Sequence, residues 1–422
     1  MKNRILRISL LVTVFLYLGA VSPSLAQVTD GFVANPPMFQ ARYYHTATLL
    51  ADGRILITGG SSSVGGAALA TAEVYNPTTG RFQTTGTMNV ARIGHSATRL
   101  NDGRVLIVGG TATNGSNTAE VYNPTGNLAG TFTYTGPTVK NRTGHSATLL
   151  SNGQVLIAGG GDPRDPTHLP NKGELFTPSA NAFTETTGSM ISPRTLPSAS
   201  RLPDGRVLLA GGDGWTTSTN PFTHLTLDVS MPLFTTELYN PSTQTFTSGP
   251  NMSSVRVAPS STSLLLNNGK TLLVGTGEAS FQPPTAQVFN PLNNTLSAPI
   301  ALHQDINTNG DVGSAGHKAA ILANGNVLIT GGATYSNLTA AELLNPFIVS
   351  TLPYAFIYNP TAQTFTRYTA DLARASHTMT SLPNCKVLIT GGAVAGGSVT
   401  NSTVIFQYSG CLSPAPTATP YL

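Results

Sequence analysis

HSATRLNDGRVLIVGG, at residues 95–110, decides the fold, because the same pattern begins at seven places along the chain. An alternation of apolar and polar residues leads to a turn, a run of four apolar residues follows, and a pair of glycines usually ends the pattern. The copies begin, at intervals of 50 to 64 residues, at His45, His95, His145, Pro197, Ser261, His317 and His377. A recurring period of this length is typical of a repeat protein, in which each unit buries its apolar face against its neighbours.

Each repeat is predicted to contain four short antiparallel strands. The first two join at Asn-Gly or Asp-Gly in six copies and at Asn384-Cys385 in the seventh. Asn-Gly and Asp-Gly tolerate the two positive φ angles of a type I′ hairpin. The third strand carries a segment such as Val121-Tyr122 and ends at a proline, which cannot donate a hydrogen bond to a sheet. A fourth strand contains Phe or Leu, such as Phe132. Seven such repeats predict an all-β fold, a seven-bladed β-propeller.

The repeats resemble the kelch repeat, in which four apolar residues and a double glycine precede a spaced tyrosine and a later aromatic residue. The resemblance extends from about residue 32 to residue 408, and six copies agree in phase. Two departures stand out. The last aromatic is Phe or Leu where kelch repeats usually have Trp, and the fifth copy has Gly275-Thr276 instead of Gly-Gly. The resemblance implies a kelch-type propeller.

The ends of the repeat region predict how the ring closes. The seventh repeat has only three predicted strands, at residues 377–382, 386–390 and 403–408. The segment GFVANPPM at residues 31–38 resembles the fourth-strand segments that end in Met88 and Met190. We expect it to add the missing strand to the last blade, so that no sheet edge stays open. The propeller is therefore expected over residues 27–412, with a Pro- and Thr-rich tail at residues 413–422.

Residues 1–26 are predicted to be a secretory signal peptide. Lys2, Arg4 and Arg7 precede a mostly apolar stretch at residues 8–21, and Ser24-Leu25-Ala26 resembles a cleavage site. The apolar stretch is shorter than the roughly 20 residues that span a bilayer. We expect a monomeric mature protein with no membrane span, secreted, periplasmic or at the cell surface. Without residues 1–26 the chain has 19 basic and 18 acidic residues, a charge that gives no support to nucleic-acid binding.

The two cysteines are expected to form a disulfide in an exported protein. Cys385 lies in the turn between the first and second predicted strands of the last repeat, and Cys411 follows the end of its third strand. In an up-and-down sheet these two positions lie on the same rim. The alternative is two independent buried thiols.

Residues that recur in most repeats are interpreted as parts of the scaffold, because a single site needs only one copy. Glutamates recur at the start of the third strand, at Glu73, Glu120, Glu174, Glu237 and Glu342. Arginines recur before the first strand, at Arg42, Arg92, Arg142, Arg194 and Arg374. We expect these residues to form Arg–Glu or backbone contacts within the scaffold.

Histidines recur at the start of the first strand, at His45, His95, His145, His317 and His377. They could form a partial ring at the mouth of the central channel that binds a metal or responds to pH. We favour the alternative that each histidine packs between neighbouring blades and bonds to the backbone.

Polar and aromatic residues outside the repeat gather in the loops of repeats three to six. The residues expected to form a ligand site there are Asp162, Arg164, Asp165, His168, Asp213, Trp215 and Glu278. The matching loops of repeats one, two and seven contain mostly small, uncharged residues, as in SSSVGGAALA at residues 61–70. A tryptophan with nearby carboxylates would suit a sugar, since the indole stacks on the ring and the carboxylates bond to hydroxyls. The alternative is that longer loops simply need solvating charges.

One loop has the spacing of calcium ligands. Asp305, Asn307, Asn309 and Asp311 place oxygen side chains at alternate positions, and Gly310 would permit a sharp turn, as at the start of an EF-hand loop. Gly316 stands where the loop would need a bidentate glutamate. We therefore expect a weak calcium site or a solvated turn, and no other cofactor.

Signals for catalysis are sparse, and no catalytic residue is assigned. Tyr44-His45 superficially resembles the Tyr-His pair of copper-radical oxidases, which occur among secreted kelch proteins. That family also requires a cysteine cross-linked to a tyrosine in an early blade, whereas both cysteines here lie near the C-terminus. We therefore expect a secreted binding module for glycans or for cell-surface or extracellular proteins. The alternative is a carbohydrate-directed enzyme of the sugar isomerase or oxidase type on the same rim.

Overall fold

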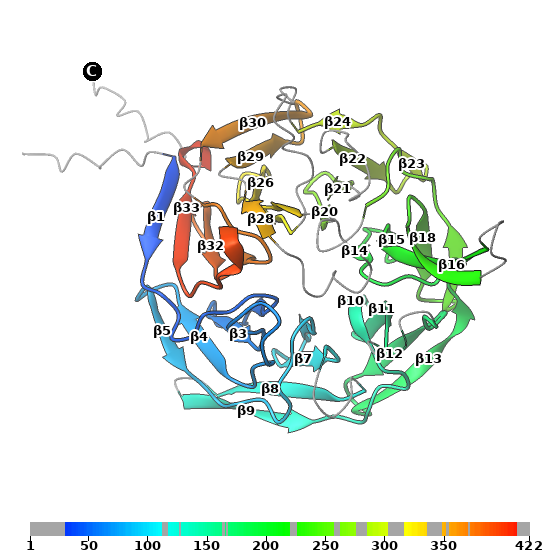
Figure 1. Cartoon of the computed structure of the whole chain (residues 1–422), viewed down its shortest axis with the longest axis horizontal. Coiled ribbons are helices and arrows are strands. Elements are labelled where there is room, and N and C mark those ends of the chain that lie inside the picture. The colour runs from blue at the N-terminus through cyan, green and yellow to red at the C-terminus, as the bar shows by residue number, and fades with distance from the viewer. Residues whose placement is uncertain are drawn as a thin grey trace, which may run out of the picture.

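The computed structural model describes residues 30–111, 117–125, 128–162, 165, 168–219, 226–256, 262–275, 285–302, 316–335, 348–351, 354–369 and 372–411. In these ranges the strands form seven antiparallel blades arranged in a ring (Figure 1). The predicted seven-bladed propeller is thereby confirmed. None of the helices in these ranges is long and apolar enough to cross a membrane.

The first four blades follow the chain in order. Blade one contains β2 (Thr46–Leu49), β3 (Ile55–Thr58), β4 (Ala72–Asn76) and β5 (Arg81–Thr84). Blade two contains β6 (Ser96–Arg99), β7 (Val105–Val108), β8 (Ala119–Thr125) and β9 (Leu128–Tyr134). Blade three contains β10 (Thr143–Leu149), β11 (Val155–Gly161), β12 (Lys172–Thr177) and β13 (Ala182–Ser189). Blade four contains β14 (Ser198–Arg201), β15 (Val207–Ala210), β18 (Thr236–Asn240) and β19 (Thr245–Ser248).

The remaining blades complete the ring. Blade five contains β20 (Thr262–Leu265), β21 (Thr271–Gly275), β22 (Thr285–Asn290) and a divided outer strand, β23 (Thr295–Leu296) and β24 (Ile300–Ala301). Blade six contains β25 (Lys318–Ile321), β26 (Val327–Thr330), β29 (Tyr354–Asn359) and β30 (Thr364–Thr369). Blade seven contains β31 (Thr378–Leu382), β32 (Lys386–Thr390), β33 (Thr403–Gln407) and β1 (Gly31–Asn35). Two short 3₁₀ helices, η1 (Ala395–Gly397) and η2 (Ser409–Cys411), belong to the last repeat.

Among the described residues, two blades carry an additional hairpin between their second and third strands. In blade four it consists of β16 (Asp213–Thr219) and β17 (Thr226–Pro232), and in blade six of β27 (Ala333–Tyr335) and β28 (Ile348–Thr351). The hairpin in blade six also corrects one assignment. Glu342, expected at the start of the third strand, lies outside the described residues, and the third strand is β29, where Phe356 pairs with Ile329.

The ring closes through the N-terminal segment, as predicted. Strand β1 pairs antiparallel with β33, with Phe32 opposite Phe406. The rings of Phe32 and Phe406 lie 4.8 Å apart. In other blades the third and fourth strands carry the same kind of pair, such as Tyr75 and Phe82 at 4.9 Å. Strand β1 therefore replaces the fourth strand of blade seven in its side-chain packing as well as in its pairing.

The disulfide between Cys385 and Cys411 is also confirmed. Cys385 lies in the turn between β31 and β32, and Cys411 follows β33 at the end of η2. The backbone N–H of Tyr408 donates to the Cys385 carbonyl at 3.3 Å, so the two segments already run together beside the bond. The disulfide thereby fixes the C-terminal end of blade seven.

The hairpin turns between first and second strands differ from the prediction. In blade one, Gly53 N–H donates to Leu50 O, and Gly53 has a φ of 85°, whereas Asp52 has an ordinary negative φ. This is a three-residue loop in which a type I turn is followed by a left-handed glycine, and not a type I′ turn. The Asp52 carboxylate explains the choice, because it accepts from the Arg54 backbone N–H at 3.0 Å and stabilises the type I conformation.

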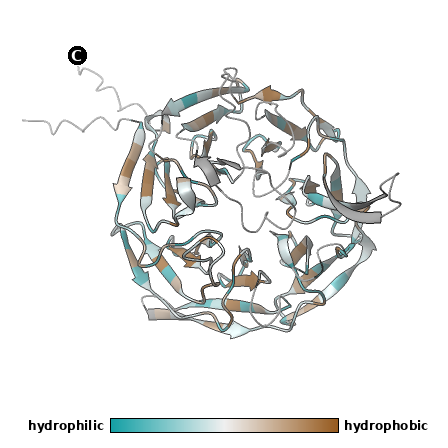
Figure 2. Ribbon diagram, in the orientation of Figure 1, coloured by the Kyte–Doolittle hydropathy of each residue, from teal (hydrophilic) through white to brown (hydrophobic). Residues whose placement is uncertain are grey.

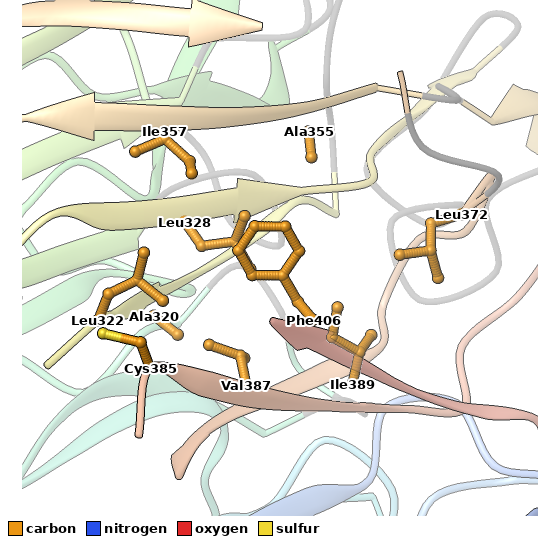
Figure 3. Packing of buried hydrophobic residues seen from close by; sticks show 10 residues of the cluster. All are labelled: Ala320, Leu322, Leu328, Ala355, Ile357, Leu372, Cys385, Val387, Ile389 and Phe406. Carbon is orange, nitrogen blue, oxygen red and sulfur yellow. The ribbon is translucent and has the colours of Figure 1, made fainter. Parts of the chain in front are cut away.

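The hydrophobic core lies between the blades. The second strand of six blades, such as Val105–Val108, is buried along its whole length, because both faces of its sheet are covered by neighbouring blades. In blade seven only Lys386, the first residue of β32, is exposed. Figure 3 shows the cluster between blades six and seven, where Phe406 extends from β33 toward Leu328 and Ile357. Figure 2 shows hydrophobic residues along the strands of the blades. A similar cluster between blades seven and one, which contains Leu388 and Ile57, makes the packing continuous across the closure.

In each of four blades, a buried arginine bonds to a glutamate and to backbone carbonyls of the same blade. In blade one, Arg42 donates to Gly59 O at 2.8 Å and to Thr71 O at 3.0 Å, and pairs with Glu73 at 3.1 Å. Glu73 also accepts from the backbone N–H of Phe39 at 2.8 Å. The other three pairs, all buried, are Arg92–Glu120, Arg142–Glu174 and Arg194–Glu237. The expected Arg–Glu scaffold contact is confirmed for these four blades.

The arginine persists where the glutamate is replaced. Blade five has Gln287 at the glutamate position, 3.5 Å from Arg256, and in blade seven Arg374 bonds to Ser402. Burial lowers the pKa of Arg256 and of Arg374 to about 10. The arginine therefore has a role besides pairing with a carboxylate, namely to satisfy the carbonyls at the end of the second strand.

The double glycine lies between two such arginines. Gly59 O accepts from Arg42 of its own blade, and Gly60 N–H donates at 2.8 Å to the carbonyl of Arg92 in the next blade. Both glycines have positive φ, and a Cβ atom on Gly59 would lie 2.6 Å from Arg92 O. Five further bonds repeat this link, from Gly110 to Arg142, Gly160 to Arg194, Gly212 to Arg256, Gly332 to Arg374 and Gly392 to Arg42. The last one crosses the closure of the ring.

Replacing Glu174 by alanine should lower stability by about 3–5 kcal/mol, because Arg142 would remain charged and buried without its partner. Glu174→Gln should lower it less, since blade five is built with Gln287 opposite Arg256. Urea denaturation of both variants measures the difference. The control is Asp102→Ala, which removes the exposed pair Arg104–Asp102 and should cost less than about 1 kcal/mol. Equal losses of stability for Glu174→Ala and Asp102→Ala would show that the buried pair contributes no more to stability than the exposed pair.

Candidate functional site

The loops that follow each double glycine and the arms that precede each first strand meet on one rim of the ring, called here the double-glycine rim. Isolated antiparallel bridges join the two kinds of segment, with Tyr43 opposite Ser61 and Ile93 opposite Thr111. Blade four repeats the arrangement with Thr195 opposite Asp213. The two kinds of segment therefore lie side by side on this rim.

On blade four, the additional hairpin positions Asp213 and Trp215. Asp213 and Thr195 exchange two backbone hydrogen bonds of 2.8 Å, which fix the start of β16 to the arm before β14. Trp215 follows two residues later, opposite Ser230 in β17. Its side chain is partly exposed, whereas Asp213 is only 2% exposed. Asp213 is therefore not a solvating charge, and Trp215 is the residue of this pair that reaches the surface.

On blade three, Asp162 and its neighbours occupy the corresponding loop after Gly159-Gly160. Asp162 accepts a 2.6 Å hydrogen bond from the Asn141 amide, which comes from the arm before β10. Asp165 pairs with His168 at 2.9 Å, with side chains 53% and 82% exposed. A contact this exposed contributes little to stability, and it fits the interpretation of a solvated loop. Asp162 and Asn141 form the more ordered polar group.

The same rim carries small or apolar residues on other blades. Tyr43, Ala375 and Ala393 form a buried cluster on blades one and seven, with Val64 and Val399 packed against it. At the position of Asp213, blades one, two, three and seven have Ser61, Thr111, Gly161 and Ala393. The backbone pairing at this position is the same in these blades. Only the side chain differs, and blade four has a carboxylate there.

Five of the seven residues expected at the ligand site are described and lie on the double-glycine rim: Asp162, Asp165, His168, Asp213 and Trp215. Arg164 and Glu278 lie outside the described residues, as do all four candidate calcium ligands, Asp305, Asn307, Asn309 and Asp311. In the part of the chain that is described, no three His, Cys, Asp or Glu side chains are grouped so that they could hold a metal ion.

The recurring histidines lie between blades, as favoured, and His45 and His145 also bond to the backbone of Arg42 and Arg142. Their Nε2 atoms contact hydroxyls of the neighbouring blade. His95 of blade two lies 3.0 Å from the hydroxyl of Thr58 in blade one, through its Nε2 atom. His145 contacts Ser96 in the same way at 2.8 Å, and His377 contacts Thr330 at 2.9 Å. Serine and threonine hydroxyls can both donate and accept, so they accommodate either tautomer of a neutral imidazole.

His45 makes the corresponding contact across the ring closure. Its Nε2 atom lies 3.0 Å from the Thr390 hydroxyl and 3.1 Å from the Thr378 hydroxyl, both in blade seven. Burial, helped by the charge of Arg42, lowers the pKa of His45 to about 3. His45 thus shares the scaffold environment of His95 and His145.

Two hollows lie on the opposite rim, among the hairpin turns between first and second strands. One, of about 530 Å³, lies between blades three and four and is lined by Asn152, Asp204, Arg206 and Asn240, among others. The second, of about 430 Å³, is lined by Arg99, Asp102 and Leu149, among others. The Asp-Gly-Arg turns mark this rim in the sequence, but Arg206–Asp204 pairs at 2.6 Å and Arg104–Asp102 at 2.7 Å, so these charges satisfy each other.

Comparison with known proteins supports the fold assignment. A family model for the Kelch motif matches residues 42–89. This match and the seven blades confirm the resemblance to kelch-repeat propellers. No curated protein matches the sequence.

One similar solved structure is a novel fungal alcohol oxidase with catalytic diversity among the AA5 family, in complex with copper. It is 16% identical, with a TM-score of 0.67, over 92% of this chain and 79% of that one. Likeness at this identity shows a shared fold alone.

The neutral histidines predict acid sensitivity. Burial and the charges of Arg142 and Arg92 lower the pKa of His145 to about 3, whereas an unfolded histidine titrates near pH 6.5. Between these values the unfolded chain binds more protons than the folded one, so stability present above about pH 6.5 should fall as the pH falls toward 3. The melting temperature, measured from pH 7 to pH 4, should decrease less steeply in His145→Gln than in the unsubstituted protein. Parallel curves would contradict a neutral, buried His145.

Proposed function

We propose that the protein is an exported binding module that recognises a glycan through the double-glycine rim of blades three and four. A closed propeller with rigid blades supports a binding role, because loops on a rigid frame can vary without loss of the fold. The observation that carries the proposal is the asymmetry of this rim. Trp215, Asp213 and Asp162 occupy it on blades three and four, whereas small and apolar residues occupy it on blades one and seven.

Trp215 is proposed as the stacking platform. A partly exposed indole at the base of a hairpin presents an apolar face to the C–H groups of a sugar ring, and its N–H can bond to a hydroxyl. The backbone pairing between Asp213 and Thr195 would hold this platform in place. Asp162, oriented by Asn141, is proposed to accept hydrogen bonds from the sugar hydroxyls. A protein ligand remains the second possibility, with the same tryptophan as its anchor.

Export is part of this proposal. The disulfide between Cys385 and Cys411 supports an oxidising environment, because such bonds persist mainly outside the cytoplasm. The proposed signal peptide at residues 1–26 lies outside the described residues. A carbohydrate-directed enzyme on the same rim has less support, since His45, the residue that suggested an oxidase, is held between Thr378 and Thr390.

Trp215→Ala should abolish binding on a glycan array while it leaves the melting temperature nearly unchanged, because a partly exposed side chain contributes little to the core. Ser63→Ala, at an exposed position in the corresponding loop of blade one, serves as the matched control and should change neither property. A large fall in the melting temperature of Trp215→Ala would identify the tryptophan as a core residue. Retained glycan binding by a folded Trp215→Ala variant would reject this surface as the binding site.

A further inference from the structure

Lys318 is a departure from the repeat at the first residue of the first strand. At this position, other blades have a serine or threonine, namely Thr46, Ser96, Ser146, Ser198, Thr262 and Thr378. Several of these hydroxyls bond to the histidine of the following blade, as Ser96 does to His145. In blade six, Thr330 alone provides the hydroxyl that contacts His377. The scaffold therefore does not need Lys318, and nothing in the repeat explains a lysine there.

Two buried histidines lie near Lys318. Its charge contributes to lowering the pKa of both His45 and His377, which places these two imidazoles within its electrostatic range. Both imidazoles are held neutral mainly by burial. Lys318 is itself partly buried, and burial lowers its pKa. Within the residues that the structure describes, Lys318 has no carboxylate partner.

Lys318 lies where the innermost strands of the ring begin. Strand β25 packs between β20 and β31, the first strands of the neighbouring blades, and these first strands start at the double-glycine rim. The residues just before them are linked around the ring, since Ser376 N–H donates to Gly316 O at 3.0 Å and Tyr44 N–H donates to Ser376 O at 3.3 Å. Lys318 is therefore placed at the inner edge of this rim, over blades six, seven and one.

We propose that this inner edge is an oxyanion-binding site centred on Lys318, for a carboxylate or phosphate group of a small ligand. A partly buried ammonium group that has no counter-ion among the described residues destabilises the fold, and a bound oxyanion would provide a partner. Thr330, which pairs with Lys318 across the blade, and Thr378 in the adjacent strand supply nearby hydroxyls. The site goes beyond the glycan surface on blades three and four and does not depend on it.

Calorimetric titration tests the site with three probes at constant ionic strength: inorganic phosphate, D-glucuronate and neutral D-glucose. The unsubstituted protein should bind at least one of the two anions saturably and more tightly than glucose. Lys318→Thr, which restores the repeat, should weaken that binding roughly ten- to a hundredfold, as expected for loss of a hydrogen bond to a charged group. Lys386→Thr removes an exposed lysine from β32 and should leave the affinity unchanged.

Lys318→Met, which keeps the aliphatic stem, provides a second folded variant if the threonine substitution disturbs packing. Preference for phosphate or for glucuronate identifies which oxyanion the site takes. Absence of saturable binding by both anions, or equal affinity in the Lys318 variants and the unsubstituted protein, would overturn the proposal. Trp215→Ala should retain anion binding, so this site can fail or stand independently of the proposed glycan surface.

Discussion

The contact on which the propeller depends is the buried arginine that precedes each first strand in six of the seven repeats. Its guanidinium binds the carbonyl at the end of the second strand, and its backbone carbonyl accepts from the double glycine of the preceding blade. One residue thus satisfies polar groups within a blade and between blades, at a corner where water is largely excluded. The glutamate is the variable part, since Gln287 or Ser402 can stand in for it. In the sequence of the sixth repeat, Ser314 stands at the arginine position.

This arrangement explains where the protein can vary. The backbone of the double-glycine rim is fixed by the arginine bonds and by bridges such as Thr195 with Asp213, whatever the side chains are. The rim can therefore carry different side chains on the same backbone. Asp213 stands where blade one has a serine, and Lys318 stands where blade one has a threonine. Blades one and two stay close to the repeat, and the departures that we propose as binding sites lie on blades three, four and six. The proposed binding residues are therefore separate from the scaffold residues.

Most of the fold could be predicted from the sequence, because seven copies report the same local preferences. The closing strand β1, the disulfide and the Arg–Glu contacts followed from the phase of the repeat. The turn type was wrong, because Asp52 and its equivalents stabilise a type I turn with one left-handed glycine, and only Asn384 and Cys385 of blade seven are both left-handed. Glu342 was misplaced because the additional hairpin of blade six separates β26 from β29. Single departures such as Lys318 have no periodic signal, so only the aligned strands reveal them.

The central claim is that the arginine links make the seven blades one cooperative ring. Native-state hydrogen exchange of the amides that donate to the arginine carbonyls, those of Gly60, Gly110, Gly160, Gly212, Gly332 and Gly392, tests it most directly. The account predicts that all six amides exchange with the same opening free energy, equal to that of global unfolding, including Gly392 at the closure. The claim would be contradicted if the opening free energies differed from blade to blade, with one of these amides opening at a free energy well below that of global unfolding.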